Sequence, residues 1–142
     1  MNPRNKKINK RKYYRSLRAQ QLPIVEATII KEVETTLLQL KPFTKTNNYL
    51  GIYWPQSGEV DLRNIKISSA ISLALPAAHN NGRLSYHPWG INPLKQDACK
   101  IPAPRDEPEL DPGEIALILI PALSIDHQGQ RLGYGGGFFD RL

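Results

Sequence analysis

The 142-residue chain has 40% hydrophobic and 23% charged residues, which is typical of one ordinary globular domain with one core. No apolar run approaches the roughly 20 residues of a bilayer span, and the basic N-terminus lacks the apolar segment of a signal peptide. The single cysteine, Cys99, has no partner for an internal disulfide, which agrees with a reducing compartment. We therefore expect a cytoplasmic protein with no membrane contact.

The net charge of +6 is concentrated in residues 1–18. Residues 1–18 contain eight lysines and arginines and no acid, whereas the rest of the chain has 11 basic and 13 acidic residues. Such a segment can be a solvated helix face, a tail for nucleic acid, or a set of phosphate ligands for a nucleotide. Composition alone favours the solvated face.

Two helices are predicted before residue 42. Between about residues 7 and 21, apolar and aromatic side chains recur near helical spacing, and we expect Pro23 to break that helix. The second runs from about residue 25 to residue 40, where apolar residues repeat every three or four positions and Pro42 ends the pattern.

Strands and helices alternate in the next part of the chain. Residues 48–55, NYLGIYWP, are short, aromatic and β-branched, which predicts a buried strand. Residues 59–69 return to a helical pattern, with Asp61 as a plausible N-cap. Residues 70–78, AISLALPAA, are a continuous apolar run of strand length.

Asn81-Gly82 predicts a hairpin turn between the strand at 70–78 and a second strand, RLSYHPW. The proline-rich residues 92–113 predict an irregular crossover with little helix. Residues 113–123, GEIALILIPAL, have the unbroken apolar character of a core strand covered on both faces. This order predicts a layered α/β domain with a mostly parallel sheet flanked by helices.

The chain ends in RLGYGGGFFDRL at residues 131–142, directly after the strongest strand. In α/β sheets, glycine-rich turns at strand ends bind phosphates through backbone N–H groups, and Arg131 and Arg141 flank this turn. The turn lacks a Walker lysine, and Phe138 replaces the third glycine of a dinucleotide fingerprint. It is either a phosphate-binding loop or a flexible or packed turn, and Asp140 is either a helix cap or a Mg²⁺ ligand.

A second candidate site is GIYWPQSGEVD at residues 51–61. Glu59 could accept hydrogen bonds from a heterocycle with amide or amino donors, and Tyr53 and Trp54 could stack on its ring. The alternative is a capping acid with two core aromatics. The three histidines are scattered without the spacing of metal ligands, so they receive no role.

Three segments, in order, resemble the 5-formyltetrahydrofolate cyclo-ligase family, also called methenyltetrahydrofolate synthetases. RLGYGGGFFDRL, preceded by LILIPALSIDHQG, resembles the family signature. IYWPQSGEVD resembles its folate-contacting turn, and KINKR at residues 7–11 resembles its N-terminal nucleotide contact. LALPAA and IPAP extend the likeness over most of the chain.

The resemblance implies a Rossmann-like fold of the NagB/RpiA/CoA-transferase type and ATP- and Mg²⁺-dependent closure of 5-formyltetrahydrofolate to 5,10-methenyltetrahydrofolate. In that reaction the formyl oxygen attacks the γ-phosphate, nitrogen 10 then adds to the activated carbon, and ADP and phosphate are released. Such phosphoryl transfer needs mainly positioning and charge neutralisation.

Carried over by position, the resemblance implies several groups of site residues. Lys7 and Arg11 would bind ATP phosphates, Trp54 and Glu59 would hold the pterin, and Asp140 would bind Mg²⁺. The triphosphate would also be wrapped by Arg131, Leu132, Gly133, Tyr134, Gly135, Gly136, Gly137, Phe138 and Phe139. The folate would also contact Tyr134, Gly135, Gly136, Gly137 and Phe138, and the catalytic residues would be Arg131 and Tyr134.

The sequence departs from the family pattern in two places. Tyr134 and Gly136 stand where some members have a lysine or arginine, which leaves more charge neutralisation to Arg131, Lys7, Arg11 and Mg²⁺. Members also usually continue past this motif, so residues 1–142 are expected to be a single, C-terminally truncated domain, and a monomer. The alternatives are an inactive fragment of the family or a basic nucleic-acid-binding module.

Overall fold

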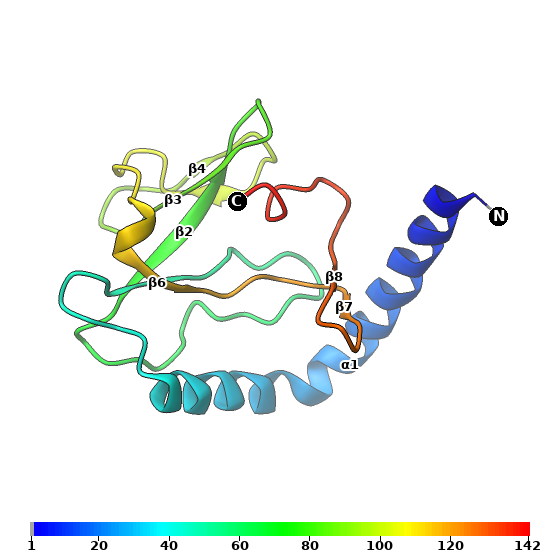
Figure 1. Cartoon of the computed structure of the whole chain (residues 1–142), viewed down its shortest axis with the longest axis horizontal. Coiled ribbons are helices and arrows are strands. Elements are labelled where there is room, and N and C mark those ends of the chain that lie inside the picture. The colour runs from blue at the N-terminus through cyan, green and yellow to red at the C-terminus, as the bar shows by residue number, and fades with distance from the viewer. Residues whose placement is uncertain (1) are drawn as a thin grey trace.

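The computed structural model describes residues 2–142, which form one long helix, a central sheet and two small two-stranded sheets (Figure 1). The elements in chain order are α1 (Pro3–Leu40), β1 (Tyr49–Gly51), β2 (Ser72–Ala78), β3 (Leu84–Pro88), β4 (Lys95–Gln96), β5 (Pro102–Ala103), the 3₁₀ turn η1 (Pro112–Glu114), β6 (Ile115–Ile118), β7 (Ser124–Ile125) and β8 (Arg131–Leu132).

The central sheet has the strand order β3-β2-β1-β6. Strand β1 pairs in parallel with both β2 and β6, and only β3 runs antiparallel, to β2. The predicted hairpin turn is confirmed: Gly82 has φ +84°, a conformation that glycine adopts without a steric penalty. The mostly parallel α/β sheet is therefore as the sequence predicted.

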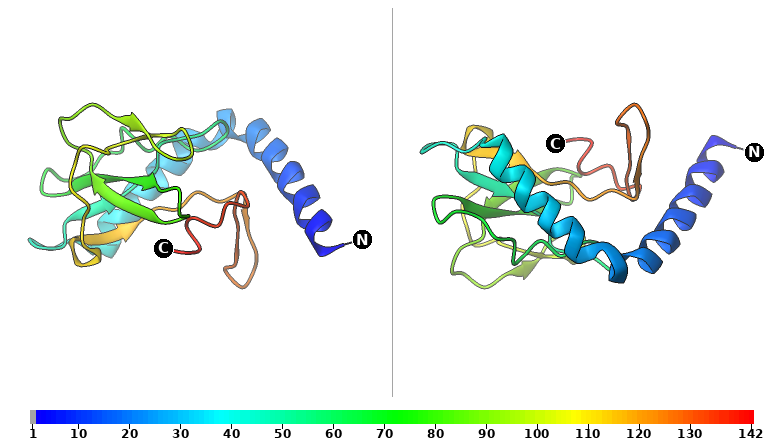
Figure 2. Two further views of the ribbon diagram at one scale, coloured as in Figure 1. Left: turned by 90° about the horizontal axis from the view of Figure 1, so that it is seen from above. Right: turned by 90° about the horizontal axis from the view of Figure 1, so that it is seen from below.

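The prediction of two helices divided at Pro23 is wrong, because α1 is one helix of 38 residues with Pro23 inside it. It begins after Asn2, whose side chain accepts a hydrogen bond from the N–H of Arg4 at 3.0 Å. A proline inside a helix removes one hydrogen bond and bends the axis, and Figures 1 and 2 show α1 changing direction near its middle. The proline therefore bends the helix without ending it.

The predicted helix at residues 59–69 is also wrong, since this segment has no helical residue in the structure. The carboxylate of Asp61 accepts hydrogen bonds from the N–H and the guanidinium of Arg63, which favours a local turn. Acids of α1 accept two further backbone N–H groups: Glu26 accepts from Asp61 at 3.2 Å, and Glu34 accepts from Lys66 at 2.8 Å. Hydrogen bonds to acids of α1 thus take the place of some backbone hydrogen bonds that a helix at residues 59–69 would have formed.

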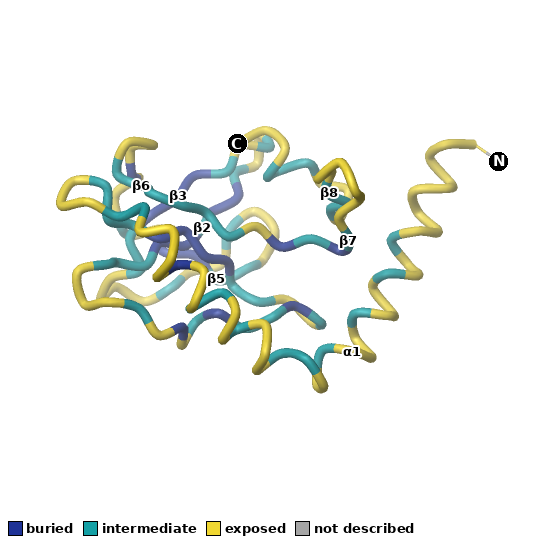
Figure 3. The backbone as a smooth tube through the Cα atoms, turned by 60° about the horizontal axis from the view of Figure 1, so that its bottom comes forward, coloured by how far each residue is buried: buried dark blue, intermediate teal, exposed yellow. Residues whose placement is uncertain are grey.

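The main core lies between the sheet and the C-terminal half of α1. Leu37 packs there with Leu50, Ile52 and Leu75, and Figure 3 shows the buried backbone concentrated in the sheet while the N-terminal half of α1 is largely exposed. Residues 92–113 form the expected irregular crossover, with only β4, β5 and η1. Within residues 2–142, no helix is both long and apolar enough to cross a bilayer.

The expectation that the apolar run at 113–123 is covered on both faces is not met. Strand β6 is shorter than that run, and all four of its residues are partly exposed. The reason is its place at one edge of the central sheet, where it pairs with β1 alone.

A methyl group at Gly51 is expected to destabilise the sheet. An added Cβ would lie 3.0 Å from both Ile118 Cγ1 and Tyr86 Cε1, so Gly51→Ala should lower the free energy of unfolding by about 1–3 kcal/mol. Urea denaturation followed by circular dichroism measures this. Gly113→Ala is the matched control, because a Cβ there meets nothing within 4 Å. Equal stability of the two variants would contradict the close packing of β1.

Candidate active site

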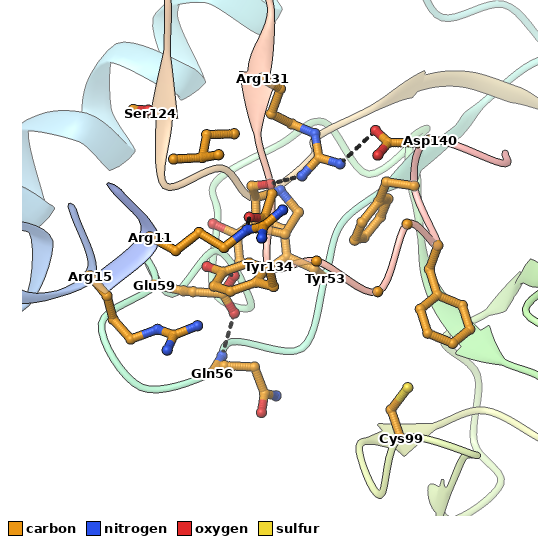
Figure 4. Close-up of a pocket in the computed structure, with 18 of the residues that line it drawn as sticks. Arg11, Arg15, Tyr53, Gln56, Glu59, Cys99, Ser124, Arg131, Tyr134 and Asp140 are labelled. Carbon is orange, nitrogen blue, oxygen red and sulfur yellow. Dashed lines mark hydrogen bonds and ion pairs between the residues drawn. The ribbon is translucent and has the colours of Figure 1, made fainter. Parts of the chain in front are cut away.

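A cavity of about 950 Å³ lies between the N-terminal half of α1, the turn at residues 53–59 and the C-terminal glycine loop, residues 133–137 (Figure 4). It brings together segments from the two ends and the middle of the chain. All the site residues predicted from the sequence line it: Lys7, Arg11, Trp54, Glu59, Arg131, Leu132, Gly133, Tyr134, Gly135, Gly136, Gly137, Phe138, Phe139 and Asp140.

The glycine loop presents free backbone N–H groups. Within residues 2–142, no protein acceptor bonds the N–H groups of residues 134–138. Gly135 and Gly137 have φ of +103° and +70°, values that L side chains rarely adopt, so glycine is required for this backbone path. Consecutive free N–H groups in such a turn form a concave anion-binding surface.

Arginines place positive charge beside this loop. Arg131 donates to the carbonyl of Pro121 and to the Asp140 carboxylate, both at 3.0 Å, and its guanidinium lies 5.6 Å from the ring centroid of Phe139. Arg11 reaches the loop from α1 and donates through Nε to the carbonyl of Gly133 at 2.9 Å. Both guanidinium groups are thus held at the cavity with further N–H donors to offer an anion.

Asp140 offers a single carboxylate to a metal. Its side chain is 74% exposed and lies in a turn, not at the start of a helix, so the alternative role of helix cap is not observed. Among residues 2–142, no three His, Cys, Asp or Glu side chains cluster as a metal site. One accessible carboxylate beside an anion-binding loop fits Mg²⁺ that is held mainly by phosphates and water.

Glu59 forms the opposite wall of the cavity and is only 5% exposed. One carboxylate oxygen accepts the N–H of Gln56 at 2.6 Å, and the other accepts the hydroxyl of Tyr134 at 2.8 Å. Nearby, Tyr53 donates its hydroxyl to the carbonyl of Val60 at 2.8 Å, and burial, followed by the charge of Glu59, raises the pKa of Tyr53. Each oxygen of this buried carboxylate therefore accepts one hydrogen bond from the protein, and the acid lies at the wall of the cavity.

Trp54 lines the cavity but already has two neighbours. Its ring packs edge to face against Trp89, with the centroids 6.0 Å apart, and the guanidinium of Arg63 lies 4.5 Å from its centroid. Arg63 is in turn paired with Asp61 at 2.7 Å. The tryptophan is thus fixed by stacking before any ligand arrives.

Sequence reasoning missed two arginines of the site. Arg15 and Arg18 follow Arg11 at helical spacing, so all three reach the same side of α1. The guanidinium groups of Arg15 and Arg18 lie 5.8 and 5.3 Å from the ring centroid of Tyr134. The signal was the repeat at positions 11, 15 and 18, which the density of charge in this segment concealed.

The comparisons with known proteins agree with this geometry. The model of the 5-formyltetrahydrofolate cyclo-ligase family matches residues 5–142. The chain belongs to this family. A curated 5-formyltetrahydrofolate cyclo-ligase from Mycolicibacterium smegmatis is 33% identical over an alignment of 93 residues that covers 61% of this chain and 48% of that protein. The match thus spans about half the length of that cyclo-ligase.

Two solved structures share the fold. The 5,10-methenyltetrahydrofolate synthetase of Aquifex aeolicus superposes with a TM-score of 0.75 at 26% identity, over 95% of this chain and 70% of that one. The synthetase of Mycoplasma pneumoniae superposes with a TM-score of 0.66 at 19% identity, over 95% of this chain and 75% of that one. The α/β architecture is therefore that of the cyclo-ligase family.

The raised pKa of Tyr134 predicts that the folded protein loses stability at alkaline pH. Burial raises its pKa from 10 to about 12, with a smaller contribution from its hydrogen bond to Glu59. The unfolded chain releases this proton first, so the contribution of Tyr134 is present below pH 10 and is lost as the pH rises to about 12. The melting temperature of Tyr134→Phe should fall less steeply than that of the wild type over this window. Parallel curves would contradict a raised pKa for this partly covered phenol.

Proposed function

We propose that this chain catalyses the ATP- and Mg²⁺-dependent cyclisation of 5-formyltetrahydrofolate to 5,10-methenyltetrahydrofolate, with release of ADP and phosphate. One observation carries the proposal: a single cavity joins a buried carboxylate, Glu59, to a glycine loop with free N–H groups and flanking arginines. A heterocycle and a triphosphate could therefore meet in one site.

Phosphate binding is assigned to the loop and to the bases around it. The free N–H groups of residues 134–138 supply donors, and Lys7, Arg11 and Arg131 supply charge. The side chains of Leu132, Phe138 and Phe139 complete the wall against the nucleotide. When bound with the nucleotide at Asp140, Mg²⁺ would supply neutralisation of phosphate charge.

Folate binding is assigned to the opposite wall. Glu59 accepts N–H groups of the pterin, and Trp54 provides an aromatic surface beside it. The glycines of the loop would let its backbone approach both ligands, and we assign Arg131 and Tyr134, which line the cavity, to the reacting formyl and phosphate groups. Catalysis then consists of positioning and of charge neutralisation by Arg131.

We infer that the basic segment serves this site and not nucleic acid. Lys7, Lys10, Arg11 and Arg15 all line the cavity, and the rest of the chain has more acids than bases. We propose an enzyme that acts on small molecules, and we expect it to be monomeric and cytoplasmic.

The assay is incubation of the folded, purified chain with Mg-ATP and 5-formyltetrahydrofolate, following the absorbance of the methenyl product. Glu59→Gln should weaken folate binding and raise KM roughly 10- to 100-fold, because a hydrogen bond to a charged acceptor is replaced. Glu109→Gln is the matched control, since Glu109 pairs with Arg83 on the surface and does not line the cavity. An unchanged KM would refute the assignment of Glu59.

Asp140→Ala tests the metal assignment in the same assay. Turnover should become undetectable at Mg²⁺ concentrations that saturate the wild type, because the exposed carboxylate beside the glycine loop that is assigned to the metal is removed. Asp106→Ala is the control, as Asp106 pairs with Lys95 at 2.8 Å outside the cavity. Wild-type magnesium dependence in Asp140→Ala would refute this assignment.

A further inference from the structure

The hydroxyl of Tyr134 lies between a cation and an anion. It donates to Glu59 Oε2 at 2.8 Å and accepts from Arg18 Nη1. An arginine can only donate and a carboxylate can only accept, so the single hydroxyl proton must point toward Glu59. The three side chains therefore form one directed chain of hydrogen bonds from α1 through the glycine loop to Glu59.

Arg18 is built into this position. Nη1 also donates to the carbonyl of Ala122 at 3.3 Å, and Nε is buried without a hydrogen-bond partner within the described chain. The guanidinium packs beside Gly58, where a Cβ would lie in ordinary contact with it, 3.5 Å from Nε. A buried N–H without a partner costs free energy. The bonds that Arg18 donates to Tyr134 and Ala122 offset this cost and hold the side chain in place.

Tyr134 occupies the acceptor that a heterocycle needs. The Gln56 N–H uses Oε1 of Glu59, the Tyr134 hydroxyl uses Oε2, and Figure 4 shows the tyrosine lying over the acid at the cavity. Glu59 is only 5% exposed and Oε2 already accepts the phenol, so an incoming amino or amide N–H would compete with the phenol for this oxygen.

We propose that Tyr134 is a latch that competes with the pteridine for Glu59, and that Arg18 is the positioning residue that holds the latch closed. This inference rests on the proposed folate site. In the free protein the latch fixes the glycine loop at residue 134. The N–H donors of the pteridine replace the hydroxyl at Glu59 and release the loop.

Binding of 5-formyltetrahydrofolate without ATP, measured by titration calorimetry, tests the competition. Tyr134→Phe removes the competitor and should bind roughly 3- to 10-fold more tightly than the wild type. Arg18→Gln should also bind more tightly, and the double variant should bind no more tightly than Tyr134→Phe, because both changes act through the same bond. A merely structural role would weaken binding.

Limited chymotrypsin cleavage after Phe138 tests the latch without any ligand. Tyr134→Phe and Arg18→Gln should each be cut roughly 3- to 10-fold faster there, since the open loop becomes more populated. Cleavage in the core after Tyr53 should not change. The matched controls are Tyr13→Phe and Arg4→Gln, because both residues are exposed on α1 away from the cavity.

The outcomes separate the two proposals. Equal or weaker folate binding by Tyr134→Phe, or unchanged cleavage after Phe138, would overturn the latch. Absence of folate binding by the wild type, together with faster cleavage in both variants, would overturn the proposed folate site while leaving the loop contact to Glu59 supported.

Discussion

The site depends on α1 remaining one helix through Pro23. Its C-terminal half packs Leu37 into the core, whereas its N-terminal half brings Arg11 to Gly133 and Arg18 to Tyr134 in the glycine loop. A proline in a helix interior costs a hydrogen bond and bends the axis, and the bend directs the two halves to different parts of the molecule. Because both halves of α1 are held by tertiary contacts, the helix continues through Pro23, a residue that usually ends a helix.

Backbone donors and cationic side chains meet at the glycine loop. The glycine loop offers free N–H groups, and the cations that contact or flank it come from α1, from β8 and, as Arg141, from the C-terminal turn. The carboxylate of Asp140, beside the loop, is paired with Arg131. A phosphate that attracts the arginine would therefore free the acid, so anion and cation binding are expected to support each other.

The two walls of the cavity are joined by the hydroxyl of Tyr134. Because it bonds Glu59 directly and Arg18 stabilises it, the state of the acid is linked to the position of the loop. Pairing a buried carboxylate with a neutral phenol also satisfies it at a lower desolvation cost than burying a second charge beside it. The same bond can thus stabilise the free protein and yield to a ligand with better donors.

The sequence by itself determined the strands around 49–51 and 72–78, the Asn81-Gly82 hairpin and the glycine loop, because periodicity and turn chemistry act over a few residues. The family signature in residues 131–142 also pointed to the segments that meet at the cavity. Only the tertiary structure decided that Pro23 lies inside a helix, that residues 59–69 bond to acids of α1, and that Arg18 and Tyr134 meet Glu59. These three features depend on contacts between residues far apart in the chain. Such contacts outweigh local conformational preference, so they cannot be predicted from short stretches of sequence.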